Sequence, residues 1–526
     1  MATLHAEKSL EFNISGPCFP DEHYMLGALN RLPNAKQLSN TGKYFVIHAP
    51  RQSGKTTALL SLTDEINNES RYHAVYCTLE MVPNNAELCI GVSSIVTEIV
   101  IKISNELPGF SEKINNIVIH ADPTHAIYKL LSDVSALLDR PLILFFDEAD
   151  CLSGGLMINF LHQLRAGYNS RKKAPFPHSV ALVGMRNIHD YKIFIRGQEE
   201  SLGTASPFNI IDKTLTLRNF TYDEVRELYM QHTELTRQIF NDDAIRQAFY
   251  WTDGQPWLTN AIPRQIIEED LEYDYSIPIT SAHVDAAVDA MSKRPDAHML
   301  SIFKRLEEER VQRIIEPMLV GDALNQNLLG DDARYCIDIG LVKINDDRNL
   351  LPANPLYCDL IVRYLTYTHQ NDLPVSLKNR WMNDETIDMT ALLKEFQKFW
   401  RENSEIWKDK FKTKYSHAAA QLLLHTFLQR VTNGGAKIHR EFALGSYRAD
   451  ICITYKDKNY PIEIKMESPM ALGDAIPQLA RYMDHCGANQ GWLVVFATSL
   501  KKAWKDKIYW RQQELDNGGC IHIVGC

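Results

Sequence analysis

Residues 43–66 constrain the fold of this chain most strongly, because they join a strand, a polar loop and a helix within one short stretch. The apolar, β-branched run KYFVIHA at residues 43–49 predicts a buried strand. The polar turn PRQSG follows, and then KTTALLSLTDEI, with apolar residues at helical spacing. A loop at such a junction directs backbone N–H groups and the positive end of the helix towards a bound anion. Residues 49–57 are therefore predicted to bind phosphate.

The loop supplies the residue types that bind a nucleoside triphosphate. Lys55 is expected to reach the β- and γ-phosphates, and the Thr56 hydroxyl to hold Mg²⁺. The first glycine of the pattern G-x-x-x-x-G-K-[ST] is replaced by Ala49, which is tolerable where the backbone does not need a positive φ. ATP and Mg²⁺ are the expected cofactors. The predicted nucleotide-binding residues of the loop are Pro50, Arg51, Gln52, Ser53, Gly54, Lys55, Thr56 and Thr57.

A second strand supplies the acidic half of the same site. Residues 142–150, LILFFDEAD, fit a strand buried on both faces of a parallel sheet, with acids at its carboxyl end. Asp147 is expected to coordinate Mg²⁺, and Glu148 to polarise the attacking water. A third strand, HSVALVGMRN, ends in Arg186, which is placed to sense the γ-phosphate. A solvated arginine after a strand is the alternative interpretation of Arg186.

Several segments of the first half of the chain resemble a known group of ATPases. They are the APRQSGKT loop, the DEAD acids, the strand ending in Arg186 and the segment LRNFTYDEVRELY. These look like the archaeal-type ATPases allied to the STAND and origin-recognition branches of the AAA+ superfamily. The resemblance spans roughly residues 10–290 and implies an α/β core sheet followed by a helical lid. It also implies a nucleotide-dependent homo-oligomer, since relatives often assemble through an arginine supplied by a neighbour.

Within the lid, the GQPW segment is similar to the G-x-P motif of STAND proteins. In that family the proline, here Pro256, lies against the base or sugar of the nucleotide. The alternative is a turn in which Trp257 only packs. The segment FNISGPCFPDEHYML, at residues 12–26, resembles the stretch that lies across the base in these ATPases.

The middle of the chain predicts a small helical domain with a short strand. Helices are expected at residues 299–319 and 331–344, followed by the turn NDDRN and the strand LLPA. This order is typical of a winged helix, as follows the lid in STAND and origin-recognition proteins. The acidic sequences LEEER and GDD favour packing within the chain over binding in a DNA groove. A polar stretch at residues 369–388 predicts a domain linker.

The C-terminal region carries a basic charge excess in an acidic chain. The whole chain has 56 Lys+Arg and 66 Asp+Glu, a net charge of -10. From Lys410 onwards there are 16 basic and 10 acidic residues, a net of +6, which leaves 40 and 56, a net of -16, for the remainder. Because phosphate contact needs local rather than global charge, this region is the predicted nucleic-acid surface. Its pattern of helices and strands predicts an α/β domain.

Two neighbouring strands of that domain place acids and a lysine together. Asp450 lies near the start of one predicted strand. Glu463 and Lys465 share a face of the next strand, because strand side chains alternate. Two carboxylates and a lysine are suited to metal-dependent phosphodiester cleavage, in which the acids hold the cation and the lysine orients water. A structural salt bridge is the alternative for these residues.

These residues look like the PD-(D/E)XK nuclease motif, with Ala449-Asp450 and Glu463-Ile464-Lys465 in the matching positions. The resemblance implies that Asp450, Glu463 and the Ile464 carbonyl bind Mg²⁺, with Mn²⁺ also accepted. Gln478 and Tyr482 are similar to the Q-x-x-x-Y of the RecB-like branch, and their spacing places both on one helix face towards a DNA backbone. A histidine on the helix of that branch joins the metal; for His425 a packing role is the preferred interpretation.

The chain is thus expected to be an α/β multidomain protein. The predicted domains are a P-loop ATPase core at 1–215, a helical lid at 216–292, a winged helix at 293–368, a linker and connecting helix at 369–409, and a restriction-endonuclease-like domain at 410–526. No apolar run of about 18 residues and no paired C-x-x-C spacing occurs, so a cytoplasmic protein with reduced cysteines, no membrane segment and no zinc site is expected.

The leading hypothesis is an ATP-dependent regulator, switched by a triggering partner, that controls a DNA nuclease. Such pairings in bacterial proteins suggest defence against mobile DNA. One alternative is a STAND-like signalling scaffold whose C-terminal domain binds DNA or protein without cutting. A second is an ATP-driven DNA-remodelling protein, although no helicase motif supports it.

Overall fold

The computed structural model divides into two compact units. The first comprises Met1–Ala287 with Asp338–Gly340, and the second comprises Val288–Ile337 with Leu341–Cys526. The described residues are 10–83, 87–152, 154–185, 210–294, 297–319, 330–345, 348–370, 381, 385–411, 423–425, 427–428, 436–440, 451–467, 469–497 and 503–526.

The first unit is built on a five-stranded sheet, all of whose strand pairs are parallel, as the sequence predicted. The strand order is β2-β3-β4-β1-β5, so β4 lies between β1 and β3. The carboxyl ends of these three strands therefore meet at one edge of the sheet. The strands are β1 (Tyr44–His48), β2 (His73–Thr78), β3 (Leu142–Asp147), β4 (Ser179–Gly184) and β5 (Ile211–Thr216).

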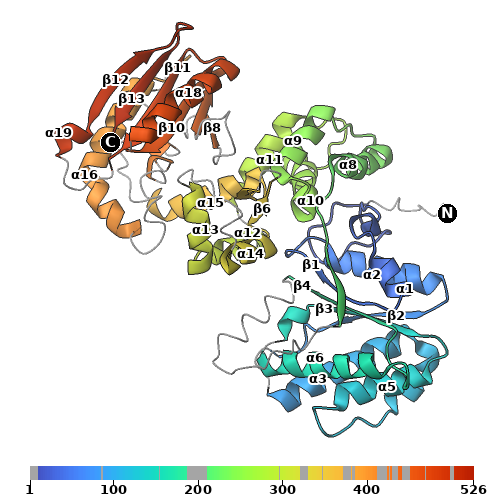
Figure 1. Cartoon of the computed structure of the whole chain (residues 1–526). Coiled ribbons are helices and arrows are strands. Elements are labelled where there is room, and N and C mark those ends of the chain that lie inside the picture. The colour runs from blue at the N-terminus through green and yellow to red at the C-terminus, as the bar shows by residue number, and fades with distance from the viewer. Residues whose placement is uncertain are drawn as a thin grey trace. The chain divides into compact units, whose positions relative to one another are not determined.

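Helices cover both faces of this sheet (Figure 1). Alternate residues of β1 enter different cores: Phe45 and Ile47 pack with α1 (Ala35–Asn40) and α2 (Lys55–Asn68). Tyr44 and Val46 pack in the opposite core, which α3, α5 and α6 complete. The remaining elements around this sheet are η1 (Ala28–Arg31), α3 (Leu88–Glu106), η2 (Pro108–Phe110), α4 (Ser111–Asn115), α5 (Ala126–Leu137), η3 (Ala149–Cys151) and α6 (Gly154–Ser170).

Helix α3 is, within the described ranges, the one helix long and apolar enough to cross a membrane. Its residues Val92, Ile95 and Ile99 are almost completely buried in the core beneath the sheet. Its apolar character is therefore used to cover the sheet.

A group of helices follows β5. Helix α8 begins with a capping box, in which the Thr221 side chain and the Glu224 backbone and side chain bond reciprocally. Pro256 occupies the first turn of α10, where its missing N–H costs nothing. These helices are α8 (Tyr222–Thr236), α9 (Asp242–Thr252), α10 (Pro256–Arg264), the π-helical turn η4 (Gln265–Asp270) and α11 (Ser281–Lys293).

Two helices predicted for the middle region have different bounds in the structure. The helix expected at 299–319 is two helices, α12 (Ala297–Arg305) and α13 (Glu309–Leu319). The residues between them are not helical, and the carbonyls of Leu306 and Glu307 there accept hydrogen bonds from the side chain of Gln312 in α13. The helix expected at 331–344 ends early, as α14 (Asp331–Asp338), because Gly340 has a φ of +77° and the chain turns into a strand. The hairpin β6 (Val342–Ile344) and β7 (Leu350–Pro352) follows, then α15 (Pro355–Gln370).

The C-terminal part is a six-stranded mixed sheet in the order β12-β13-β11-β10-β9-β8. β11 is parallel to β10 and to β13, and the other pairs are antiparallel. Leu493 and Val495 face α18 on one side, whereas Phe496 packs against Phe396 and Trp400 of α16 on the other. The elements are α16 (Met389–Phe411), β8 (Lys437–Arg440), β9 (Ile451–Tyr455), β10 (Lys458–Met466), α18 (Pro469–His485), β11 (Gln490–Phe496), α19 (Trp504–Lys507), β12 (Tyr509–Glu514) and β13 (Cys520–Gly525).

Candidate nucleotide-binding site

The P-loop connects β1 to α2, and its backbone departs from regular structure at two residues. Gln52 has a φ of +55° and Gly54 a φ of +82°, and the Ser53 hydroxyl donates to the Pro50 carbonyl at 2.8 Å. A left-handed φ at Gly54 is accessible without strain only because the residue lacks a Cβ. Ala49, which replaces the usual first glycine, does not have a positive φ, so alanine is tolerated there.

The Lys55 ammonium lies inside the loop. Its Nζ donates to the carbonyls of Ala49, at 3.0 Å, and Pro50, at 2.8 Å. Burial lowers the pKa of Lys55, and the carboxylates of Asp147 and Glu148 oppose that shift. A bound triphosphate would offer phosphate oxygens to the same ammonium in place of the two carbonyls.

The loop and the acidic strand end are in direct contact. The Thr56 hydroxyl donates to Asp147 Oδ2 at 2.8 Å, and the backbone N–H of Glu148 donates to Asp147 Oδ1 at 2.9 Å. The Tyr76 hydroxyl, from β2, also donates to Asp147 Oδ2, at 3.1 Å. Asp147 is 1 % exposed, so these three donors fix its orientation. Tyr76 could not be predicted from the sequence, because no local motif marks it.

Glu148 has the conformation and the environment of a functional acid. Its φ of +53° places a non-glycine residue in the left-handed region, which costs free energy and is common at functional sites. Burial raises the pKa of Glu148, and the neighbouring carboxylates of Asp150 and Asp147 raise it further. A carboxylate with a raised pKa is a better proton acceptor for an attacking water.

Two further nucleotide-site predictions have different outcomes. Arg186 lies outside the described residues, which end at Met185 after β4 and begin again at Ile210. Pro256 is buried as the first residue of α10. Next to it, the Trp257 indole N–H donates to the Ile14 carbonyl at 2.8 Å, so Trp257 holds the N-terminal segment as well as packing.

The N-terminal segment also reaches the nucleotide-binding loop. The backbone N–H of Cys18 donates to the Thr57 hydroxyl at 3.0 Å, at the start of α2. The Tyr24 hydroxyl contacts His232 of α8 at 3.0 Å, and the side chain of Gln231 bonds to the backbone of Met25. The segment therefore joins the P-loop helix to the helices that follow β5.

The C-terminal acids and lysine are only partly within the described residues. Glu463 is completely buried, and Lys465 Nζ lies 2.8 Å from Glu463 Oε1. Asp450 lies outside the described residues; its sequence neighbour Ile451 pairs with Ile462. Ile464 is buried near the carboxyl end of β10. In the part of the chain that the structure describes, no group of three or more His, Cys, Asp or Glu residues could hold a metal ion.

The helix residues predicted to face nucleic acid are half-buried on α18. The Tyr482 hydroxyl bonds to the thiol of Cys452, whose pKa burial raises to about 11. Gln478 lies one turn before Tyr482 on the same helix. His425 is 9 % exposed, consistent with the packing role preferred for it.

A cavity of about 670 Å³ lies in the helical layer formed by α5 and α6. Its lining includes His125, Tyr128, His162 and Gln163. None of the residues predicted to bind nucleotide lines it, so it is separate from the P-loop site.

Residues 29–288 match the family described as AAA-like domain. This part of the chain is an AAA-like P-loop ATPase domain. Residues 385–499 match a domain of unknown function, DUF8371. The second match assigns no activity to the C-terminal region, and a search of curated proteins gives no match.

Solved structures similar to this chain include three archaeal proteins. The Walker-type ATPase PABY2304 of Pyrococcus abyssi is 15% identical with a TM-score of 0.47, and the match covers 66% of this chain and 99% of that one. Orc1 of Aeropyrum pernix, solved in complex with DNA, is 12% identical with a TM-score of 0.33, covering 66% and 95%. Cdc6p of Pyrobaculum aerophilum is 14% identical with a TM-score of 0.35, covering 65% and 93%.

Proposed function

We propose that the AAA-like domain binds ATP with Mg²⁺ and hydrolyses it. The observation that carries this proposal is the 2.8 Å contact between Thr56 of the P-loop and Asp147 of β3, beside the buried ammonium of Lys55. A hydroxyl and a carboxylate at this distance are hard oxygen ligands of the kind Mg²⁺ prefers. The proposal therefore joins the phosphate-binding and metal-binding halves of the site in one place.

Each residue of the site has a separate part in the proposed reaction. Lys55 and the loop N–H groups would bind the β- and γ-phosphates, and Thr56 and Asp147 would hold the cation, which would neutralise phosphate charge. Glu148 accepts a proton from the attacking water. Pro256 of the lid contacts the base or sugar, and Arg186 senses the γ-phosphate.

Two substitutions separate nucleotide binding from hydrolysis. Lys55→Ala should abolish binding of a fluorescent ATP analogue, because the buried charge that meets the phosphates is lost. Glu148→Gln should bind the analogue normally but release phosphate about 10²- to 10⁴-fold more slowly. Lys36→Ala, which removes an α1 lysine paired with Glu65, is the control. Hydrolysis by Lys55→Ala at the wild-type rate would contradict the proposal.

We further propose that the C-terminal sheet is a metal-dependent DNA nuclease controlled by the ATPase. The favouring observation is the fully buried Glu463 with Lys465 at 2.8 Å, on β10 between β9 and β11. A buried carboxylate is costly unless a cation compensates it. In this proposal Asp450, Glu463 and the Ile464 carbonyl hold Mg²⁺ or Mn²⁺, and Lys465 orients the attacking water.

The proposed DNA contacts come from the helix that crosses the same sheet. Gln478 and Tyr482 of α18 would bind the sugar-phosphate backbone.

Cleavage of several DNA forms with Mg²⁺ or Mn²⁺, with and without ATP, tests the nuclease. Lys465→Ala should lose cleavage, whereas Lys458→Ala, an exposed lysine at the start of the same strand, should keep it. Equal behaviour of wild type and Lys465→Ala under every condition would leave the second candidate, a scaffold that binds DNA or protein without cutting.

We propose that α12, α13, α14 and the β6–β7 hairpin form a winged helix that packs within the chain. Its basic side chains have acidic partners close by: Arg313 lies 2.8 Å and Arg310 3.5 Å from Asp332, and Arg305 lies 2.7 Å from Glu308. Arginines held in such pairs offer less charge to a DNA backbone.

The proposed assembly is a nucleotide-dependent homo-oligomer.

A further inference from the structure

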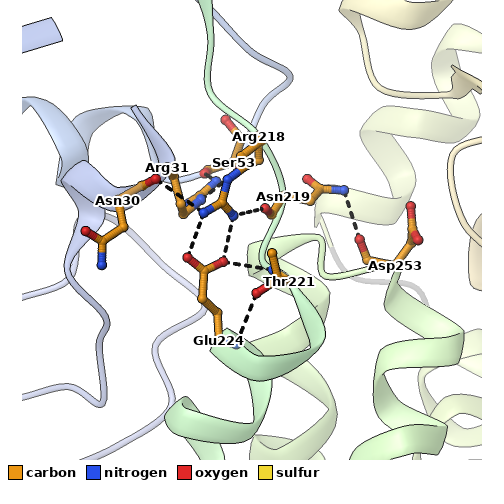
Figure 2. Close-up of polar contacts among 8 residues, drawn as sticks. All are labelled: Asn30, Arg31, Ser53, Arg218, Asn219, Thr221, Glu224 and Asp253. Atoms are coloured by element: carbon orange, nitrogen blue, oxygen red, sulfur yellow. Dashed lines mark hydrogen bonds and ion pairs between the residues drawn. The ribbon is translucent and has the colours of Figure 1, made fainter. Parts of the chain in front are cut away.

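Arg31 is a buried arginine next to the P-loop that no part of the proposed reaction uses. It is the last residue of η1 and is 3% exposed. Its Nη2 donates to the Ser53 carbonyl at 2.7 Å, and its Nε donates to the Arg218 carbonyl at 2.7 Å (Figure 2). The guanidinium also lies over the Phe220 ring, 4.6 Å from its centroid. Burial lowers its pKa to about 10, so the side chain stays charged at neutral pH.

The contact with Ser53 fixes one peptide group of the P-loop. In a planar trans peptide the carbonyl and the following N–H point in opposite directions. With the Ser53 carbonyl held towards Arg31, the N–H of Gly54 is directed away from Arg31. The guanidinium also packs closely on this glycine, since a Cβ on Gly54 would lie 3.2 Å from Arg31 Nη1. Arg31 thereby sets the orientation of a group that a phosphate-binding loop needs.

The other contacts of Arg31 lie on residues 217–221, which connect β5 to α8 and are called the hinge segment below. Within it, the Phe220 N–H donates to the Gly254 carbonyl at 2.8 Å. The next residue, Gln255, donates through its side chain to the Gln52 carbonyl at 3.3 Å. The P-loop carbonyl of Gln52 therefore accepts a bond from Gln255 of the lid. The adjacent carbonyl of Ser53 accepts one from Arg31, which also contacts the hinge segment.

The hinge segment is itself tied to the start of α8. The Arg218 guanidinium makes two bonds to the Glu224 carboxylate, at 2.7 and 2.8 Å, and a third to the Asn30 carbonyl at 3.2 Å (Figure 2). The bond to Arg218 lowers the pKa of Glu224 to about 2. Asn30 immediately precedes Arg31, so η1 contacts both the P-loop and the hinge segment, and Arg218 of the hinge segment in turn contacts the first turn of α8.

We propose that Arg31 is a positioning residue of the nucleotide site. It orients the Ser53–Gly54 peptide for phosphate binding, and it couples the P-loop to the hinge segment so that phosphate binding and lid position change together. The inference deepens the proposed function and rests on ATP binding at this site.

Arg31→Lys tests the role, because a single ammonium cannot reproduce the planar fork that reaches both carbonyls. The variant should bind Mg·ATP about tenfold more weakly, as expected for a change of about 1.4 kcal/mol. Hydrogen exchange of the hinge segment should slow on ATP binding in wild type and change little in the variant. The matched control is Arg171→Lys, since Arg171 also donates to two backbone carbonyls, of Gly42 and His178, and lies over the Tyr168 ring.

A second variant covers the case in which Arg31→Lys does not fold. Phe220→Leu removes the aromatic face under the guanidinium but leaves both hydrogen bonds available, and should weaken Mg·ATP binding about threefold. Wild-type affinity and wild-type hinge exchange in both variants would overturn the inference alone. A wild-type protein that does not bind Mg·ATP would overturn the proposed function, and with it this role of Arg31.

Discussion

At the scale of single residues, the candidate ATPase site depends on how Asp147 is held. If Thr56 and Asp147 hold a cation as proposed, the Thr56 hydroxyl would be a ligand as well as a donor to Asp147. The Tyr76 hydroxyl, at 3.1 Å from Asp147 Oδ2, remains as a side-chain donor. If Asp147 holds the cation as proposed, Tyr76 would position the metal-binding carboxylate through this bond.

Tyr76→Phe should raise the Mg²⁺ concentration needed for half-maximal ATP hydrolysis about five- to tenfold, with a smaller effect on the rate at saturating Mg²⁺. The reason is the loss of one hydrogen bond to a charged group. The measurement is phosphate release as a function of Mg²⁺ at saturating ATP. Tyr72→Phe is the control, because the Tyr72 hydroxyl donates to the Asn40 carbonyl instead. An unchanged Mg²⁺ requirement in Tyr76→Phe would show that Tyr76 does not position Asp147 for Mg²⁺ binding.

The raised pKa of Glu148 predicts how hydrolysis depends on pH. The carboxylate accepts a proton only when ionised, so activity should fall as pH decreases through a pKa above the ordinary 4.5. After burial, the largest cause of the shift is the charge of Asp150. Asp150→Asn should therefore lower this pKa and move the acidic limb of the pH–rate profile to lower pH. A limb that moves to higher pH would contradict the assignment of Glu148 as the proton acceptor.

At the scale of elements, the connection between β5 and the helices that follow it is closely packed against Gly254. Gly254 has a φ of +66°, and a Cβ on it would lie 1.9 Å from the Phe220 carbonyl oxygen. That oxygen is backbone and cannot move aside without displacing the hinge segment. Gly254 is thus required both by its own conformation and by its neighbour.

Gly254→Ala should reduce the free energy of unfolding by more than about 2 kcal/mol, through a left-handed alanine and a steric clash. Chemical denaturation measures the change, and hydrogen exchange should localise it to α9 and α10. Gly155→Ala is the matched control: nothing lies within 4 Å of its Cβ position, and it lies in α6. There alanine should be neutral or stabilising by up to about 1 kcal/mol. Similar effects of the two substitutions would show that the hinge tolerates a side chain at Gly254.

At the scale of the whole molecule, the chain combines a unit that contains the P-loop with a second unit that contains the C-terminal sheet. If the first controls the second, the two activities should respond asymmetrically to substitution. Loss of nucleotide binding should then change DNA cleavage, whereas loss of DNA cleavage should leave ATP hydrolysis nearly unchanged.

Lys55→Ala should therefore change DNA cleavage as well as ATP hydrolysis, whereas Lys465→Ala should abolish cleavage and leave ATP hydrolysis within about twofold of wild type. Parallel assays of phosphate release and DNA cleavage on the same preparations make the comparison. Cleavage by Lys55→Ala identical to wild type, with and without ATP, would mean that the two units work independently.

Some elements were predictable because their information is local. The strand, loop and helix around Lys55, and the apolar strand ending in Asp147, follow from periodicity and turn residues within about ten positions. The break between α12 and α13 was not predictable, because it depends on where the Gln312 side chain bonds. Strand β12 has no clear strand pattern in the sequence, because most of its residues, in YWRQQE, are exposed polar residues of an edge strand.

By itself, therefore, the sequence determined the α/β core with its parallel sheet, the position of the P-loop and the acidic residues at the end of β3. The tertiary structure alone brought Tyr76 to Asp147, 71 residues away, and Arg31 to the carbonyl of Arg218, 187 residues away. The physical reason is that strand order and chain packing decide which distant side chains meet, and no spacing within the sequence records that order. Local patterns specify the phosphate-binding loop, and long-range contacts specify what holds it in place.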